Sequence, residues 1–289
     1  MKPAPFDYFR ADTVEHACQL LADAGEDARL LAGGQSLIPM MNLRLARPSA
    51  LVDIGRLPLS NIDVGSDRIT IGSLARHRQV LEHEGLRAAA PLFAETYEFI
   101  AHPTVRNLGT AGGSVAHADP TAEIPALLVL LDGEIEAVSA RGARKIAAGD
   151  FFKSAFTTAL KPDEMITSLS FRMPARRWAG CFLELAERHG DFALAAVGVV
   201  VARDGDKIAD TRIVLTGAES IPIRATEVET SLRGQTLTDA RCADAGAAAA
   251  RDRRSYDDIR ASAEYRRSLL SELTSRALLT AYRRAGAPS

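Results

Sequence analysis

Hydrophobic and polar positions in the first third of the chain follow a strand–helix–strand pattern. Residues 27–32 and 51–54 are predicted to be strands, and the apolar run over 37–45 between them is typical of a buried helix. Another helix, with an apolar stripe, is predicted to begin at Asp12. A strand, a turn, a helix and a second strand in this order favour a right-handed βαβ crossover.

The middle of the chain mixes short strands and helices. Strands are predicted over 68–72, 133–138 and 165–171. Helices are predicted over 74–81, 91–100 and 124–131, with a long loop from His102 to the last of them.

The pattern changes near Arg176. Residues 192–201 and 208–216 predict two long strands, and the Asp-Gly-Asp-Lys turn between them would make the pair antiparallel. Helices are expected afterwards, over 224–232, 238–250 and 262–284. We therefore expect two domains, 1–175 and 176–289, the second with helices on an antiparallel sheet.

Composition and charge disfavour several classes of protein. The 289 residues are 47% hydrophobic and 25% charged, as in ordinary soluble proteins, and the net charge of −2 gives no reason to expect nucleic acid binding. No apolar run approaches the roughly 18 residues of a membrane span, and the opening residues lack the apolar core of a secretory signal. Cys18, Cys181 and Cys242 form neither a disulfide framework nor a metal or iron–sulfur spacing. A cytoplasmic protein is expected.

Two glycine-rich segments carry the candidate chemistry. The segment 106–123 contains Gly109, Gly112 and Gly113, interleaved with hydroxyl residues. Glycine lets backbone amides approach a ligand and adopt positive φ, and consecutive amides can form a nest for anionic oxygens. Asp119 is the expected N-cap of the following helix, with Pro120 as its first residue.

A smaller glycine segment, Ala32-Gly33-Gly34-Gln35-Ser36, lies upstream. Each segment follows a strand and precedes an apolar helix, and together they favour a ligand with two phosphates and a long body. Neither contains the G-x-G-x-x-G of a Rossmann unit or the Gly-Lys-Ser/Thr of a P-loop. Taken singly, each is more typical of a tight turn than of a cofactor site.

Three separated motifs resemble those of one known family. Residues 31–36 followed by 39–44 are similar to the first FAD loop of molybdenum hydroxylase flavoprotein subunits. Residues 106–114 with 119–125 resemble their second FAD loop, and 262–267 resemble a signature of their C-terminal domain. The likeness spans nearly the whole chain. The chain therefore resembles the medium subunits of the carbon monoxide dehydrogenase and xanthine dehydrogenase family.

This resemblance implies an α+β fold. The N-terminal FAD-binding domain, of the PCMH type, would consist of two α/β subdomains at about 1–57 and 58–175 with FAD extended between them. Residues 176–289 would form a domain like the CO dehydrogenase flavoprotein C-terminal domain, an antiparallel sheet with helices. The backbone of both glycine segments would bind the pyrophosphate and the adjoining ribityl chain. The residues implied are Ala32, Gly33, Gly34, Gln35, Ser36, Thr110, Ala111, Gly112, Gly113 and Ser114.

Four further residues are implied as cofactor contacts. Glu123 falls where the family places an acidic residue on the ribityl hydroxyls, although a solvated surface carboxylate is the ordinary alternative. Ala101 would contribute its backbone near the flavin ring, and Leu160 its main chain unless it only packs in the core. Phe192 matches an aromatic position near the isoalloxazine, or is an ordinary Phe at a strand start. Many relatives have a lysine near Glu184, so no cationic contact is expected there.

The implied function is electron transfer. FAD would receive electrons from [2Fe–2S] clusters in a small subunit and pass them to an external acceptor, while a molybdopterin-binding large subunit hydroxylates the substrate. A dimer of such heterotrimers is expected. His117 is discounted as a base, so no catalytic residue is assigned here.

Two other functions stay open. A self-contained FAD-dependent oxidase or dehydrogenase of the vanillyl-alcohol oxidase type would need a substrate-cap domain, for which this chain has little room. An assembly protein without flavin is disfavoured by the intact glycines and Glu123. The substrate and the electron acceptor are not determined, although the motifs favour an N-heteroaromatic substrate.

Overall fold

A small parallel sheet forms the N-terminal end of the molecule. A computed structural model describes residues 2–286. The sheet has the order β1-β3-β2, from β1 (Asp7–Arg10), β3 (Ala50–Asp53) and β2 (Arg29–Leu31). Helix α1 (Val14–Ala24) begins after Thr13, whose side chain accepts a hydrogen bond from the His16 amide, and α2 (Leu37–Asn42) connects β2 to β3. The predicted strand–helix–strand unit is confirmed as a parallel pair, whereas β1 was not predicted.

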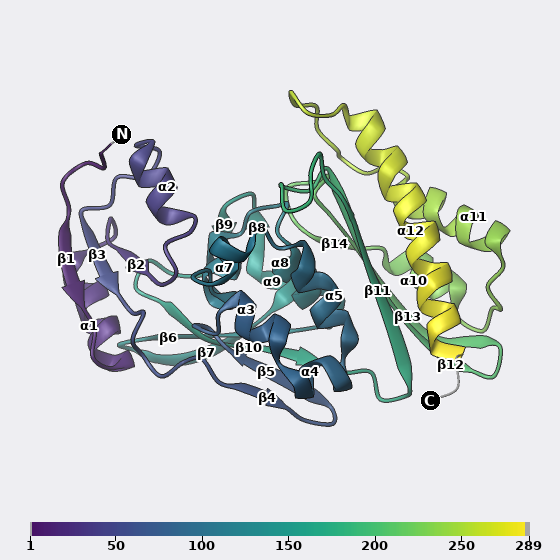
Figure 1. Cartoon of the computed structure of the whole chain (residues 1–289), viewed down its shortest axis with the longest axis horizontal. Helices are drawn as coiled ribbons and strands as arrows, with labels where there is room; N and C mark the ends of the chain where they lie inside the picture. The colour runs from purple at the N-terminus through teal and green to yellow at the C-terminus, as the bar shows by residue number, and fades with distance from the viewer. Residues whose placement is uncertain (1, 287–289) are drawn as a thin grey trace.

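A five-stranded antiparallel sheet follows in the centre (Figure 1). Its order is β4 (Ile62–Val64), β5 (Arg68–Gly72), β10 (Met165–Arg172), β6 (Glu134–Ser139) and β7 (Gly142–Ala147). The helices of this part include α3 (His77–Glu82), α4 (Glu84–Ala89), α5 (Pro91–Phe99) and α8 (Glu123–Leu130). Helix α8 is buried from Ile124 to Leu130, which explains its continuous apolar sequence. Short elements α9 (Ala148–Phe151), β8 (Phe152–Ser154) and β9 (Thr157–Thr158) complete the subdomain.

The prediction of a long loop before α8 is wrong. Its first part forms α6 (Pro103–Arg106) and its glycine-rich part forms α7 (Ala111–His117). The predicted cap is also wrong, because α8 begins at Glu123 rather than Pro120. Asp119 instead accepts hydrogen bonds from the amide and hydroxyl of Thr121 within the turn before α8.

A four-stranded antiparallel sheet forms the C-terminal part. Its order is β11 (Trp178–Leu185), β12 (Ala195–Asp204), β13 (Lys207–Thr216) and β14 (Ile223–Arg224), so the predicted hairpin is confirmed. Strand β11 was not predicted, and β12 begins three residues after the expected Phe192. Helices α10 (Thr226–Leu232), α11 (Asp239–Ala250) and α12 (Ala263–Gly286) follow. Tyr265 of α12 is 48% exposed, and the buried stripe of this helix runs through Arg266 and Leu270.

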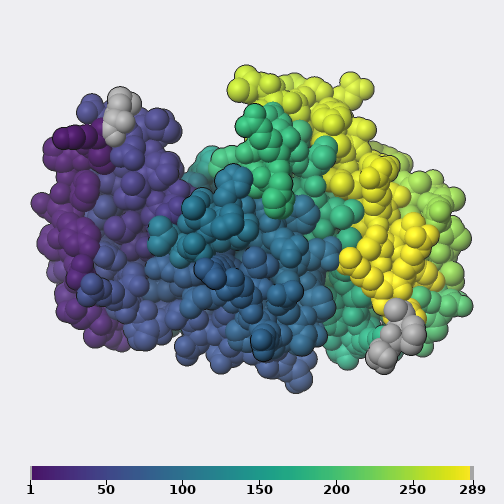
Figure 2. Space-filling view, in the orientation of Figure 1, coloured from purple at the N-terminus to yellow at the C-terminus, as the bar shows by residue number. Residues whose placement is uncertain are grey.

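The C-terminal sheet is covered on both faces. Cys181 and Val199 pack in the core beneath α11 and α12, whereas Phe182 and Val200 belong to the core shared with α5 and α8. The layers are therefore sheet, helices, sheet and helices, as Figure 1 shows from the centre to the right. Figure 2 shows a notch in the surface between the N-terminal lobe, which is built on the β1-β3-β2 sheet, and the C-terminal part.

Candidate functional site

The two glycine segments touch each other. A Cβ placed on Gly33 would lie 2.3 Å from the carbonyl oxygen of Leu108 and 2.9 Å from Cα of Gly109. The guanidinium of Arg76 donates a hydrogen bond to the same Leu108 carbonyl. Only glycine permits this approach, because any side chain at position 33 would overlap the opposing backbone. The N-terminal lobe and the central subdomain therefore meet at the two predicted segments.

The first segment presents unpaired backbone donors. In the described residues, the amides from Gly33 to Leu37 have no hydrogen-bond acceptor. Gly34 has φ 70°, and the Gln35 side chain donates to the Gly33 carbonyl at 3.1 Å. Ser36 occupies the N-cap position of α2 without a side-chain cap bond. A run of free amides at the start of a helix is a suitable environment for anionic oxygens.

The second segment has its amides already paired. The amides of Ala111 and Gly112 donate to the carbonyls of Ala75 and Ser73 at 3.0 and 2.8 Å, and the Gly113 amide donates to Oγ1 of Thr110 at 3.1 Å. The expectation that this segment forms a free nest is therefore wrong. Its glycines serve close packing instead, since a Cβ on Gly112 would lie 2.5 Å from Cβ of Ser73.

Four buried polar atoms around the second segment lack a hydrogen-bond partner within residues 2–286. They are Ser73 Oγ, His77 Nδ1, Tyr97 Oη and Glu184 Oε2. Burial, together with the guanidinium groups of Arg106 and Arg76, lowers the pKa of His77 to about 4. Unpaired buried polar atoms are unfavourable, so a cluster of them marks a place where a ligand can supply partners.

Two carboxyl groups interact beside this cluster. Glu123 lies in the first turn of α8 and is partly buried, and burial together with Asp119 raises its carboxyl pKa. Burial together with Glu123 raises the pKa of Glu184 on β11. The solvated surface carboxylate considered for Glu123 is therefore not what the structure shows.

The predicted flavin end lies where the β11–β12 connection meets the turn after α5. Ala101 has φ 43°, and Arg106 donates to the Ile100 and Ala101 carbonyls at 2.7 Å each. A Cβ on Gly190 would lie 2.8 Å from the Ala101 carbonyl oxygen, so the connection packs directly on this turn. Phe192 on the same connection is 65% exposed. Sequence reasoning missed Arg106, which fixes the strained turn.

Leu160 lies beyond this turn and follows β9. It is half-buried against the main core, and its amide donates to the Thr158 hydroxyl at 3.2 Å. The core-packing alternative for Leu160 is thus present. In residues 2–286 its carbonyl accepts no hydrogen bond, so this main-chain group stays available to a ligand.

Comparison with known proteins decides the family. Residues 4–174 match the family model described as FAD binding domain in molybdopterin dehydrogenase, and residues 181–281 match the CO dehydrogenase flavoprotein C-terminal domain. The chain belongs to this flavoprotein family. It is 40% identical over 287 residues to the 6-hydroxypseudooxynicotine dehydrogenase complex subunit alpha of Paenarthrobacter nicotinovorans, covering 99% of this chain and 97% of the relative. The nicotine 6-hydroxylase medium subunit of the same organism is 37% identical, with coverage of 97% and 99%.

Solved structures agree with the sequence relatives. Quinoline 2-oxidoreductase from Pseudomonas putida 86 matches with a TM-score of 0.95 at 32% identity, covering 99% of this chain and 100% of that chain. Carbon monoxide dehydrogenase from Hydrogenophaga pseudoflava matches with a TM-score of 0.95 at 33% identity, covering 98% and 99%. The predicted fold, family and role as the FAD subunit of a multi-subunit molybdenum hydroxylase are confirmed. The vanillyl-alcohol oxidase alternative is set aside.

The residues present fit FAD. Free amides on one segment and the unpaired Ser73 Oγ and His77 Nδ1 atoms beside the other offer partners for a dinucleotide between them. FAD supplies the ability to take up electrons singly and release them in pairs. This chain holds the cofactor, while the molybdenum and iron–sulfur centres of the flavoprotein family are carried by other subunits. In residues 2–286, no cluster of three or more His, Cys, Asp or Glu could hold a metal ion.

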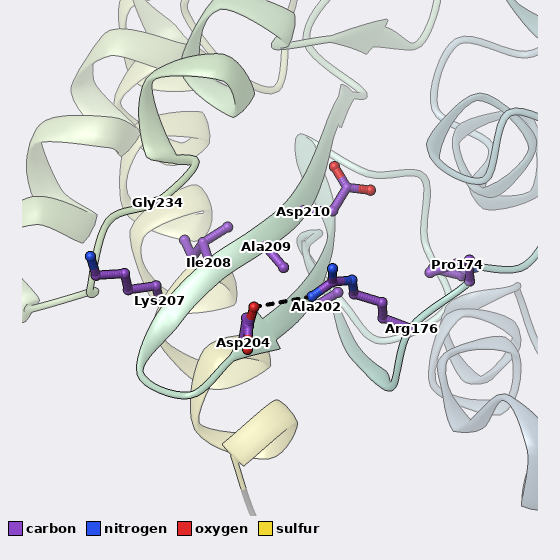
Figure 3. Close-up of a pocket in the computed structure, with 10 residues that line it drawn as sticks. Pro174, Arg176, Ala202, Asp204, Lys207, Ile208, Ala209, Asp210 and Gly234 are labelled. Atoms are coloured by element: carbon purple, nitrogen blue, oxygen red, sulfur yellow. Dashed lines mark hydrogen bonds and ion pairs between the residues drawn. The ribbon is translucent and has the colours of Figure 1, made fainter.

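A groove of about 450 Å³ lies away from the glycine segments, on the C-terminal domain. It is lined by the linker at Pro174 and Arg176 and by the β12–β13 hairpin, and it contains none of the predicted site residues. Figure 3 shows Arg176 extending toward Asp204, with which it forms an ion pair at 3.3 Å. No helix in the described part of the chain is long and apolar enough to cross a membrane.

Proposed function

We propose that FAD lies between the two glycine segments, with its pyrophosphate on the free amides from Gly33 to Leu37. On the opposite side of the FAD pyrophosphate, the backbone of Thr110 and of residues 111–114 would pack closely against the cofactor. The Ser36 and Ser114 hydroxyls would add hydrogen-bond donors. The contact of Gly33 with the Leu108 carbonyl carries this proposal, because it brings the two segments to one place. The remaining predicted contacts extend it: Ala32, Ala101 and Leu160 through their main chains, Gln35 beside Gly33, Glu123 to the ribityl hydroxyls and Phe192 to the isoalloxazine.

Replacing Gly33 by alanine tests this placement. The new methyl group would overlap the Leu108 carbonyl at 2.3 Å, and such overpacking costs about 1–3 kcal/mol, which would lower FAD affinity by about five- to 150-fold. The measurement is the flavin content of the purified complex, followed by an FAD titration. Gly149→Ala is the matched control, because a Cβ at position 149 meets nothing within 4 Å. Unchanged FAD affinity in Gly33→Ala would contradict the placement.

The complex is proposed to hydroxylate an N-heteroaromatic ring. Relatives named nicotine 6-hydroxylase medium subunit and quinoline 2-oxidoreductase support this substrate class. Other relatives are named medium chains of carbon monoxide dehydrogenase and glyceraldehyde dehydrogenase, so the flavoprotein alone does not determine the substrate. Dye reduction by the purified complex with quinoline, nicotine, carbon monoxide or glyceraldehyde tests the proposal. Reduction by carbon monoxide or glyceraldehyde alone would contradict it.

The assembly is proposed to be a dimer of heterotrimers in the cytoplasm, each with this chain, a molybdopterin subunit and a [2Fe–2S] subunit. The three cysteines are free and buried, which fits a reducing compartment. We keep the division into 1–57, 58–175 and 176–289 as a proposal for the domains. The solution mass of the purified complex tests the assembly, which requires two copies of each subunit.

A further inference from the structure

Residues 73–77 lie against the second glycine segment. They lead from β5 into α3, and two of their carbonyls accept hydrogen bonds from the first two amides of α7. In the opposite direction, the His77 amide donates to the Gly109 carbonyl at 3.1 Å, and Arg76 forms an isolated β-bridge with Thr110. None of the cofactor contacts implied by the glycine motifs comes from residues 73–77. These residues are nevertheless bound to the turn that leads into α7.

Arg76 places its guanidinium group where the two glycine segments meet. The guanidinium donates a hydrogen bond to the carbonyl oxygen of Leu108. The same oxygen faces Gly33, where an added Cβ would lie 2.3 Å from it. One carbonyl oxygen therefore lies against both Gly33 and Arg76. The positive charge is thus located next to the start of the free amides from Gly33 to Leu37.

The charge of Arg76 is not neutralised within residues 2–286. Its side chain forms no ion pair with a carboxylate there, and only one of the five guanidinium N–H groups donates a hydrogen bond. Arg78 on α3 differs, because it pairs with Glu82 at 2.8 Å. His77 adds no charge at neutral pH, since burial and the guanidinium groups of Arg106 and Arg76 lower its pKa to about 4.

A free guanidinium beside free amides is suited to a diphosphate. Backbone amides can orient the oxygens of a pyrophosphate, but they carry no net charge to balance its negative charges. A guanidinium carries a full charge and can donate two parallel hydrogen bonds to phosphate oxygens. A second observation also indicates a ligand here. Ser73 and His77, which are 3% and 5% exposed, each have a buried polar atom without a hydrogen-bond partner in the described range.

We propose that Arg76 is a cofactor-binding residue: its guanidinium, held by the Leu108 carbonyl, supplies positive charge to the FAD pyrophosphate. The inference rests on the proposed FAD site and adds to it a residue that lies outside both glycine motifs. The bond to Leu108 already restricts the long side chain before the cofactor binds. Less side-chain freedom is therefore lost on binding than for an arginine that is free in solvent.

The test is an FAD titration of the flavin-depleted complex by flavin fluorescence, at low and at high salt. Arg76→Gln removes the charge and keeps a polar side chain. It should bind FAD about ten- to a hundredfold more weakly at low salt, as expected for the loss of a hydrogen bond between charged groups. Its FAD affinity should also depend less on salt than that of wild type, because salt screens the lost interaction. Arg76→Lys keeps the charge and should retain more of the affinity than Arg76→Gln.

Arg78→Gln is the matched control. It removes the same charge two residues away, from a side chain that already has a carboxylate partner, so it should bind FAD as wild type does. Riboflavin separates a charge effect from a general disturbance of the site, because it has the flavin ring and the ribityl chain but no phosphate. Its affinity should be the same in wild type and Arg76→Gln.

Three results would overturn the inference while leaving the FAD site intact. They are equal FAD affinity in Arg76→Gln and Arg78→Gln, equal losses of FAD and riboflavin affinity in Arg76→Gln, and equal losses of FAD affinity in Arg76→Lys and Arg76→Gln. An FAD affinity of wild type that does not change with salt would also overturn it, and this measurement needs no variant. If wild type binds no FAD at all, the proposed FAD site itself fails.

Discussion

Replacing Arg266 by methionine removes a fully buried guanidinium while keeping most of the side-chain length. Arg266, in the first turns of α12, donates to the carbonyls of Leu194 at 2.7 Å and Gly217 at 3.0 Å. It also pairs with Asp258 at 2.7 Å and lies over the Tyr256 ring, 4.5 Å from its centroid. One side chain therefore ties the β11–β12 connection to the end of β13 and to the segment before α12.

The magnitude follows from these contacts. Hydrogen bonds with a charged partner contribute about 1.5–3 kcal/mol each, and removing one partner of a buried ion pair costs about 3–5 kcal/mol. In the variant, Asp258 would still accept hydrogen bonds from the amides of Arg260 and Ala261, each at 2.9 Å, and its side chain is 28% exposed to water. Both features limit the loss of folding free energy. We therefore expect Arg266→Met to cost about 3–4 kcal/mol and to lower Tm by about 6–16 °C.

Thermal melting of the purified complex checks this value. Arg266→Lys keeps the charge without the planar fork, so its loss should be smaller. Arg267→Met, the same change on the next residue of α12, is the control and should melt near wild type. If Arg266→Met melts as Arg267→Met does, the assigned role of the guanidinium is wrong.

Lowering the pH should reduce the difference in Tm between wild type and Arg266→Met. Partial burial opposes the shift, but the amides of Arg260 and Ala261 and the Arg266 guanidinium lower the pKa of Asp258 to about 2. A depressed carboxyl pKa stabilises the fold above the unfolded value of about 3.9, and that contribution is lost as pH falls toward 2. The Tm difference should therefore be largest above pH 4 and should shrink below it.

Two further predictions concern packing. Phe182→Ala should cost about 3–5 kcal/mol in urea unfolding, because the ring is fully buried between the C-terminal sheet and α5; an unchanged midpoint would contradict that packing. Burial raises the pKa of Cys181 to about 12 and of Cys242 to about 11, so neither thiol should react with iodoacetamide at pH 8 until the chain unfolds. Rapid alkylation of either cysteine in the native protein would show that its thiol is not protected by burial.

The elements that the sequence predicted correctly are those whose first residue or connecting turn is marked by a characteristic residue type. The hairpin of β12 and β13 has an Asp-Gly turn, and α5 has Pro91 in its first position. Strand β1 was missed because all of its residues are exposed, so no apolar face marks it. Strand β11 was missed because its inner residues contact both helical layers, which removes the alternation of polar and apolar positions.

The candidate site was predicted in part. Resemblance selected both glycine segments, and the contact of Gly33 with Leu108 agrees with their expected proximity. The hydrogen bonds of the amides in the second glycine segment could not be predicted. The sequence Ala-Gly-Gly-Ser has poor helix propensity because of its glycines. Helix α7 is supported by the Thr110 cap and by the carbonyls of Ser73 and Ala75, which accept hydrogen bonds from its first amides.

Covering the C-terminal sheet on both sides limits how these flavoproteins can be recombined. A fragment that begins at residue 176 would leave Phe182, Ala196 and Val200 facing water, because α5 and α8 would be missing. Such a fragment should aggregate or unfold rather than behave as a free module. Exchange of C-terminal parts between relatives must therefore preserve the shape of Leu92 and Leu130, which press against Gly180 and Gly198 of the sheet.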